Sequence, residues 1–207
     1  MAIPAQSQVG PRIVQDGSEN IMRSARSGEL VVTDAHGKYQ EAVTRGGVFT
    51  AANTATQALS LGSATATGLI LTNPAGSGKN LVVLEISSYI SAAITAVANV
   101  AVFANINSVA AAVTQTTPIT PRNALLGTGT SAVGLVASAA TLPAAPTLIR
   151  SLFGWHWVTA GTPAVQLGTK DLVDGAIVLS PGTAISIQGV TAAHSAISSI
   201  TWEEIAI

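Results

Sequence analysis

The sequence predicts an all-β protein: an antiparallel β-sandwich of about eight strands, preceded by an extended N-terminal arm and a small β-hairpin. Short segments rich in β-branched residues recur between Gly, Pro, Asn and Ser turns. Several of them alternate apolar and polar residues, as in Ile185-Ser186-Ile187-Gln188 and Ile200-Thr201-Trp202-Glu203. A period of two marks a strand with one buried face. The third observation is an uneven distribution of charge, which separates an arm from a body.

Charge divides the chain near residue 50. Charged side chains make up 9% of the 207 residues, against about 25% in an average globular protein. Nine are basic and ten acidic, and ten of them lie within residues 1–45. We therefore expect an N-terminal arm and hairpin over residues 1–50 and a sandwich domain over residues 51–207. So few charges on the body indicate that other subunits cover much of its surface.

Composition also excludes several partners. The net charge is −1, which leaves no electrostatic footprint for nucleic acid or for an anionic membrane. Without cysteine, disulfides and thiolate metal sites are excluded. The span from Ile86 to Pro121 carries no charge, but it is rich in Asn, Ser and Thr and has no Leu. It does not predict a membrane helix, which needs about 20 mostly apolar residues.

The first 28 residues have weak periodicity and contain several Pro and Gly residues. They are either a disordered terminus or an arm that becomes ordered on a neighbouring subunit, and the mixture of small, polar and apolar residues favours the arm. After the arm, "ELVVT" and "KYQEAVT" are predicted strands joined by Asp34-Ala35-His36-Gly37. A four-residue linker ending in Gly is a hairpin signal.

Beyond residue 50, strand signals recur to the end of the chain. The Ala-rich stretch 90–113 has helix-forming alanines, but its Val, Ile, Thr and Asn residues favour a strand. Residues 127–134 and 141–147 are predicted loops. The predicted strands are 56–62, 67–73, 80–90, 96–106, 131–138, 147–157, 176–181, 183–190 and 199–207.

"NPAGSGKN", residues 73–80, resembles a phosphate-binding loop only in part. A P-loop needs a leading Gly, a Ser or Thr after the Gly-Lys pair, and a helix behind it. Here the first and last of these positions are Asn73 and Asn80, and a β-branched strand follows. The segment instead predicts a tight turn that closes a hairpin between strands 67–73 and 80–90. Lys79 is then a charge at an exposed turn.

The remaining candidate residues give no catalytic or metal site. His156 lies between two tryptophans in "WHW", but His36 and His194 are far away in the sequence without metal-ligand spacing. Asp171 and Asp174 lie in a turn-like segment, and a glycosidase pair is one interpretation of them. Adjacent Glu203 and Glu204 are expected on opposite faces of a strand. We therefore expect no enzyme, no metal and no cofactor.

Three segments carry a resemblance to a known family. They are "SGELVVTDAHGKYQEAVTRGGVF", "TGLILTNPAGSGKNLVVLEI" and the closing pattern "IVLSPGTAISIQG…SSITWEEI". Together they resemble structural proteins of tailed bacteriophages, and the closing pattern is similar to jelly-roll capsid decoration (cement) proteins. The resemblance covers roughly a third of the chain and rests on turn chemistry.

The resemblance implies a jelly roll that binds the outside of a phage capsid as a homotrimer, with the major capsid protein as its partner. Its location would be the surface of the virion. Arg12, Arg23 and Arg26 would lie in the docking arm. Trp155, Trp157 and Trp202 would be packing anchors at the core or an interface.

Two other functions fit the same sequence. A fibre or host-glycan-binding sandwich would expose aromatic rings in loops, for example around "GWHW". A carbohydrate-active enzyme would use the pair Asp171 and Asp174.

Overall fold

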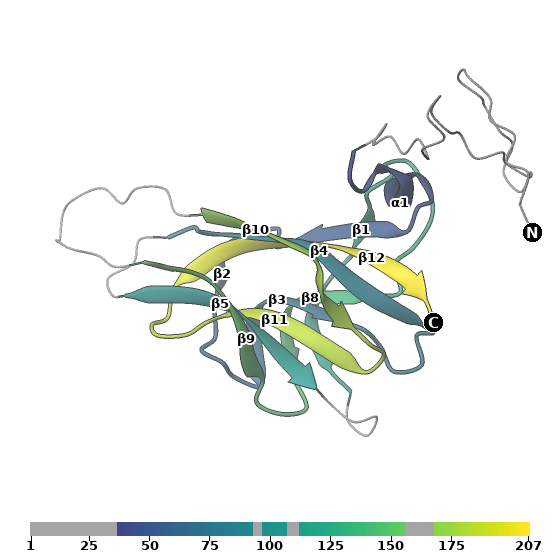
Figure 1. Ribbon diagram of the computed structural model, residues 1–207. Helices are drawn as coiled ribbons and strands as arrows, with labels where there is room; N and C mark the ends of the chain where they lie inside the picture. Colours follow the sequence, from purple (N-terminus) through teal and green to yellow (C-terminus); the bar gives the residue numbers. More distant parts are fainter. Residues whose placement is uncertain (1–36, 93–96, 107–111, 156–167) are drawn as a thin grey trace, which may run out of the picture. The chain divides into compact units, whose positions relative to one another are not determined.

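The chain is seen here as a computed structural model, which describes residues 37–92, 97–106, 112–155 and 168–207 (Figure 1). It divides into two compact units, residues 1–41 and 42–207. The second unit contains two antiparallel sheets. The expected all-β fold with two antiparallel sheets is therefore confirmed.

The first sheet has six strands in the order β10–β4–β12–β1–β7, with β2 paired to β12. The central strand β12 alternates buried and half-buried residues along most of its length, as predicted for residues 200–203. The strands are β1 (Val48–Ala52), β2 (Gln57–Ala58), β4 (Lys79–Ile90), β7 (Arg122–Asn123), β10 (Gly168–Leu179) and β12 (Ser195–Ala206).

The second sheet has the order β6–β8–β3–β11–β5–β9. β5 confirms that the centre of the Ala-rich stretch is a strand rather than a helix. The strands are β3 (Thr65–Thr72), β5 (Ala98–Ile106), β6 (Thr114–Ile119), β8 (Leu135–Thr141), β9 (Thr147–Trp155) and β11 (Thr183–Gly189).

The main core lies between the two sheets. Large apolar side chains from both sheets fill it, because alternate residues of each strand face inward. Its largest fully buried members include Trp202, Phe49, Leu69, Leu71, Leu81, Ile86, Ile187 and Ile200. Figure 1 shows the strands of the two layers, with β4, β10 and β12 in one and β3, β5, β9 and β11 in the other.

β11 differs from the one-sided strand that its alternation predicts. Ser186 and Gln188 are almost completely buried, as are Ile185 and Ile187 on the other face. The connection between β2 and β3 covers the polar face: Gln188 Oε1 accepts hydrogen bonds from Ser60 Oγ (2.7 Å) and the Ser63 amide (2.8 Å). The prediction of one buried face is wrong here, because a polar side chain can be buried when its hydrogen bonds are satisfied.

The described residues form more strands than the eight or so expected. Twelve are present, two of them only two residues long. β1 and β6 were not predicted, because they consist mostly of small residues, Thr and Pro. β10 begins eight residues before the predicted strand 176–181. The turn-like segment around Asp171 and Asp174 lies inside β10, at a bulge where Asp174 has φ 50° and Gly175 has φ 85°.

The hairpin predicted around residues 73–79 is wrong. β3 belongs to the second sheet and β4 to the first, so the turn between them crosses from one sheet to the other. The completely buried Asn73 holds the crossing in place. Its side-chain amide donates to the carbonyls of Lys79 and Leu179, both at 2.8 Å. Glycine-rich turn chemistry is the same in hairpins and in crossings, and so it did not distinguish them.

The second strand of the predicted N-terminal hairpin is also wrong, because Gln40–Thr44 forms the short helix α1. A reciprocal pair of hydrogen bonds closes its first turn: Gln40 N donates to Gly37 O (2.9 Å), and Gly37 N donates to Gln40 Oε1 (3.2 Å). These local bonds outweigh the weak strand preference of a short segment. The first predicted strand, "ELVVT", lies outside the described residues.

β1 spans the composition boundary near residue 50, so residues 48–50 belong to the first sheet. Within the second unit, successive strands change sheet at most connections. This arrangement fixes which side chains meet along the open sides of the sandwich.

Candidate functional site

Trp202, one of the predicted anchors, lies in the core of this chain. Its indole is completely buried and stacks on Phe49, with ring centroids 6.1 Å apart. Its Nε1 donates to Glu204 Oε1 at 3.4 Å. Trp202 therefore packs between the sheets.

The other predicted anchors are described less fully. Trp155 is the last residue of β9 and pairs with Ala98 of β5. Trp157, Arg12, Arg23 and Arg26 lie outside the described residues, as do His36 and His156. Their proposed contacts stay predictions.

Glu204 forms the most densely bonded polar site of the first sheet. Its side chain is 0% exposed, and Oε1 accepts the backbone amides of Val133 and Gly134, both at 2.8 Å. Oε2 pairs with Lys79 Nζ at 2.9 Å. Lys79, expected as a charge at an exposed turn, is thus tied to a buried carboxylate. Glu203 takes the other face of β12, as predicted.

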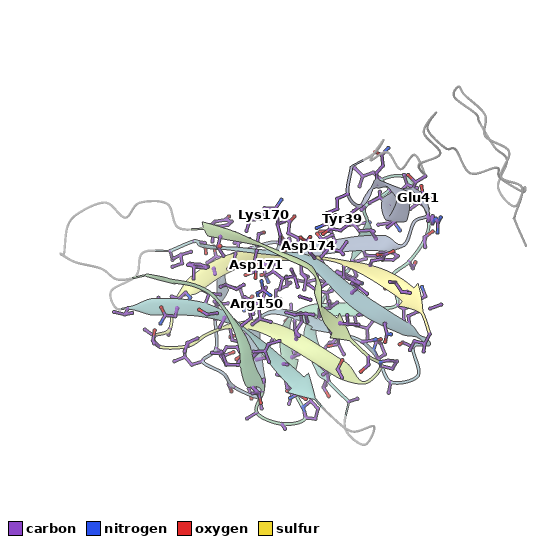
Figure 2. All side chains as sticks on the ribbon, in the orientation of Figure 1. Tyr39, Glu41, Arg150, Lys170, Asp171 and Asp174 are labelled. Carbon is purple, nitrogen blue, oxygen red and sulfur yellow. The ribbon has the colours of Figure 1, made fainter. Side chains whose placement is uncertain are left out.

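Asp171 forms an ion pair with an arginine from the other sheet. Arg150 Nε lies 2.6 Å from Asp171 Oδ2, and Arg150 Nη2 donates to Oδ1 at 2.9 Å. This two-contact pair joins the edge strands β9 and β10, and Figure 2 labels both residues. Asp171 pairs in register with Ile86 and Arg150 with Val102, both core residues, so the ion pair lies between the sheets.

The histidine within the described ranges is buried. His194 is 7% exposed, and its Nδ1 lies 2.8 Å from the carbonyl of Ala192. No three His, Asp or Glu side chains in the described ranges are grouped so that they could hold a metal ion. In the same ranges, no helix is long and apolar enough to cross a membrane.

The outer face of the first sheet, away from the core, exposes large apolar side chains. Leu172 and Val178 on β10 are 56% and 52% exposed. Register places them on the face opposite the core residues Ile86 and Leu81. Tyr89 of β4 and Ile205 of β12 are also exposed on this face. We call these four residues, Tyr89, Leu172, Val178 and Ile205, the outer apolar face.

Few ionised groups interrupt the outer apolar face. Lys170 Nζ pairs with Glu85 Oε2 at 2.8 Å, which neutralises two of them. Ser87 and Ser199, also on this face, lie with their hydroxyl oxygens 2.6 Å apart. These apolar side chains share one face of the sheet, with Tyr89 and Ile205 near opposite ends of β4 and β12, and surfaces that another molecule covers carry such exposed apolar side chains.

A cleft opens on the side of the sandwich opposite the Arg150–Asp171 pair. Its volume is about 530 Å³, within the range of ligand sites, about 300–1,000 Å³. Strands from both sheets line it. The lining residues are Thr50, Ala51, Ala52, Thr54, Thr117, Pro118, Ile119, Thr120, Arg122 and Ser138.

The sequence did not single out Arg122 or the outer apolar face. Arg122 follows the uncharged span that begins at Ile86. Its isolation as a cation was the sequence feature that could have marked it as a candidate site residue. The outer apolar face could be recognised only from the strand register, which the sequence does not supply.

Comparisons of the chain with protein-family models, with curated proteins and with solved structures found no match.

Proposed function

We propose that this chain is a non-enzymatic structural protein of a bacteriophage particle: a decoration (cement) protein that binds the outside of the capsid as a homotrimer. The phage assignment rests on the sequence resemblance described above. The outer apolar face is the observation that supports assembly, because four large apolar side chains remain exposed on one sheet of a chain with only 9% charged residues.

The proposed fold is a jelly roll. Two antiparallel six-stranded sheets and frequent changes of sheet along the chain support this proposal. A jelly roll leaves one broad face of each sheet pointing outward. The outer apolar face occupies such a position.

The proposed mechanism is the addition of many modest contacts. Burying a charge at an interface costs several kcal/mol, so a surface with few charged groups loses little free energy to desolvation when it contacts a neighbouring subunit. Ordering the N-terminal arm would cost conformational entropy, and its contacts with the major capsid protein would offset that cost. Many identical sites on one shell then convert weak contacts into strong overall binding. The shell would resist the internal pressure of packaged DNA.

The test adds the purified chain to capsids that lack it and measures bound protein by co-sedimentation. The expected result is saturable binding with three copies at each site. The double variant Leu172→Lys/Val178→Lys places two charges on the outer apolar face and is expected to reduce binding at least about tenfold.

The matched control is Leu148→Lys/Ile149→Lys on β9, where both side chains are 45% exposed. It adds the same charge at a distance from the outer apolar face and is expected to bind normally. Absence of binding to capsids would contradict the proposal. Binding to host cells in its place would favour the fibre module.

A further inference from the structure

The two open sides of the sandwich end differently. On one side, Arg150 of the second sheet and Asp171 of the first sheet close the gap with two short contacts. On the other side, β1 and β7 of the first sheet and β6 and β8 of the second leave the cleft of about 530 Å³. An arginine is present on both sides, but among the described residues a carboxylate pairs with it on only one.

Arg122 is the ionisable group of the cleft. Among the ten lining residues no other is charged and none is aromatic. Within the described part of the chain, no carboxylate lies within ion-pair distance of Arg122, whose side chain is exposed. A guanidinium is a planar fork of donors that fits a carboxylate with two parallel hydrogen bonds. The cleft is therefore complementary to a ligand that carries a carboxylate.

The remaining lining favours an extended peptide over a sugar. β6 is the last strand of the second sheet in the described residues, so one of its edges is available for backbone pairing. An extended segment can add to such an edge, and its alternate side chains then enter the adjoining cleft. Pro118 on β6 is typical of an edge strand and has no amide hydrogen to donate, so pairing with a segment would use the other residues of β6. The described lining residues include no aromatic ring that could stack on a sugar.

Hydroxyl groups complete the lining. Ser138 is 8% exposed, and its hydroxyl has only a long contact of 3.5 Å with the carbonyl of Thr117. Thr54, Thr117 and Thr120 are exposed at the cleft. These groups both donate and accept hydrogen bonds, as a peptide backbone requires.

We propose that the cleft binds an extended segment of another protein, with an Asp or Glu carboxylate on Arg122 and the backbone along β6. The contact reproduces between molecules what Asp171 and Arg150 form within the chain. The inference rests on the proposed function in one respect only, because the segment would belong to the capsid protein. The test therefore uses peptides and needs no capsid.

The probe is a library of random octapeptides selected for binding to the full-length chain. Enriched peptides are synthesised, and their Kd values are measured by fluorescence anisotropy. We expect the enriched sequences to share one Asp or Glu among β-branched residues. Each is compared with a version in which that acid is replaced by its amide.

Three variants make the result specific. Arg122→Gln removes the cation and is expected to weaken binding about tenfold or more, as loss of a charged hydrogen-bond pair does. Ala52→Tyr fills the cleft from an exposed position of β1 and is expected to abolish binding. Lys170→Gln removes the same charge from β10 and is expected to leave Kd unchanged. Circular dichroism checks that each variant folds.

The outcomes of these experiments separate the peptide-binding proposal from the proposed function. Loss of binding with Arg122→Gln and with the amide peptide, together with retention in Lys170→Gln, supports the proposal. Failure to enrich any peptide overturns it, and so do enriched peptides without an acid or peptides that bind Arg122→Gln equally well. Peptide binding without capsid binding would refute the proposed function alone. Capsid binding that survives Arg122→Gln and Ala52→Tyr would refute only the assignment of the segment to the capsid protein.

Discussion

Glu204 provides the most demanding test of the packing described here. Its carboxylate is buried at the end of β12, where it accepts two backbone amides and pairs with Lys79. The two amides belong to Val133 and Gly134, in the long connection between β7 and β8. Glu204 therefore holds this connection and the β3–β4 crossing against the same strand.

The variant Glu204→Ala leaves both amides without an acceptor. A buried donor without a partner costs about 1–3 kcal/mol, so two of them cost about 2–6 kcal/mol. Lys79 is 35% exposed, so its ammonium regains water and adds little. We expect a loss of about 4 kcal/mol in the free energy of unfolding, a large part of the 5–15 kcal/mol typical of a domain.

The variant Glu204→Gln separates charge from hydrogen bonding. Its oxygen still accepts the amides of Val133 and Gly134, but its nitrogen faces the Lys79 ammonium. A hydrogen bond to a charged acceptor contributes about 1.5–3 kcal/mol and a bond to a neutral acceptor about 1 kcal/mol. Each of the two bonds is therefore weakened by about 1 kcal/mol, and we expect the free energy of unfolding to fall by about 2 kcal/mol. The control Glu203→Gln changes the adjacent residue on the other face and is expected to cost about 0.5 kcal/mol or less.

The assay is urea unfolding followed by tryptophan fluorescence, with the slope of the transition compared among variants. An equal slope licenses comparison of the unfolding free energies. The reasoning would be refuted if Glu204→Ala cost less than about 1 kcal/mol, well under the price of two unsatisfied donors. It would also be refuted if Glu203→Gln and Glu204→Gln were equally damaging.

Three further predictions use the same assay or thermal unfolding. Gly68→Ala should prevent stable folding, because φ is +129° and a Cβ would overlap the Ile187 carbonyl, whereas Gly76→Ala, with open space around it, should cost about 1 kcal/mol. Equal losses at the two glycines would contradict the packing at β3. Asn73→Ala should cost about 2 kcal/mol through two lost hydrogen bonds, and an unchanged midpoint would show that the crossing does not depend on them. Trp202→Ala should cost about 3–5 kcal/mol, and a loss near zero would place the indole outside the core.

The sequence predicted the long strands other than β10 because their signal is local. β4, β5 and β12 contain Val, Ile and aromatic residues in runs that only a strand buries efficiently. β1 and β6 escaped prediction because "VFTAA" and "TQTTPI" have small or polar residues, and tertiary pairing decides their conformation. α1 was missed because two local hydrogen bonds fix a segment whose residue preferences are weak.

The candidate surfaces could be predicted less well, because they depend on strand register. The sequence correctly placed Glu203 and Glu204 on opposite faces, but it gave no sign that Glu204 is the buried one. The partnership of Arg150 and Asp171 joins residues from different sheets, which periodicity cannot reveal. Arg122 became notable only when β1 and β6 were seen to leave a cleft beside it.

Location of the chain in the intact particle by electron cryomicroscopy tests the central claim most directly. The account predicts repeated densities on the outside of the capsid at symmetry-related positions, each accommodating three copies of the two-sheet body. A chain found only in a tail fibre, or purified from cells as a catalyst and absent from particles, would contradict it.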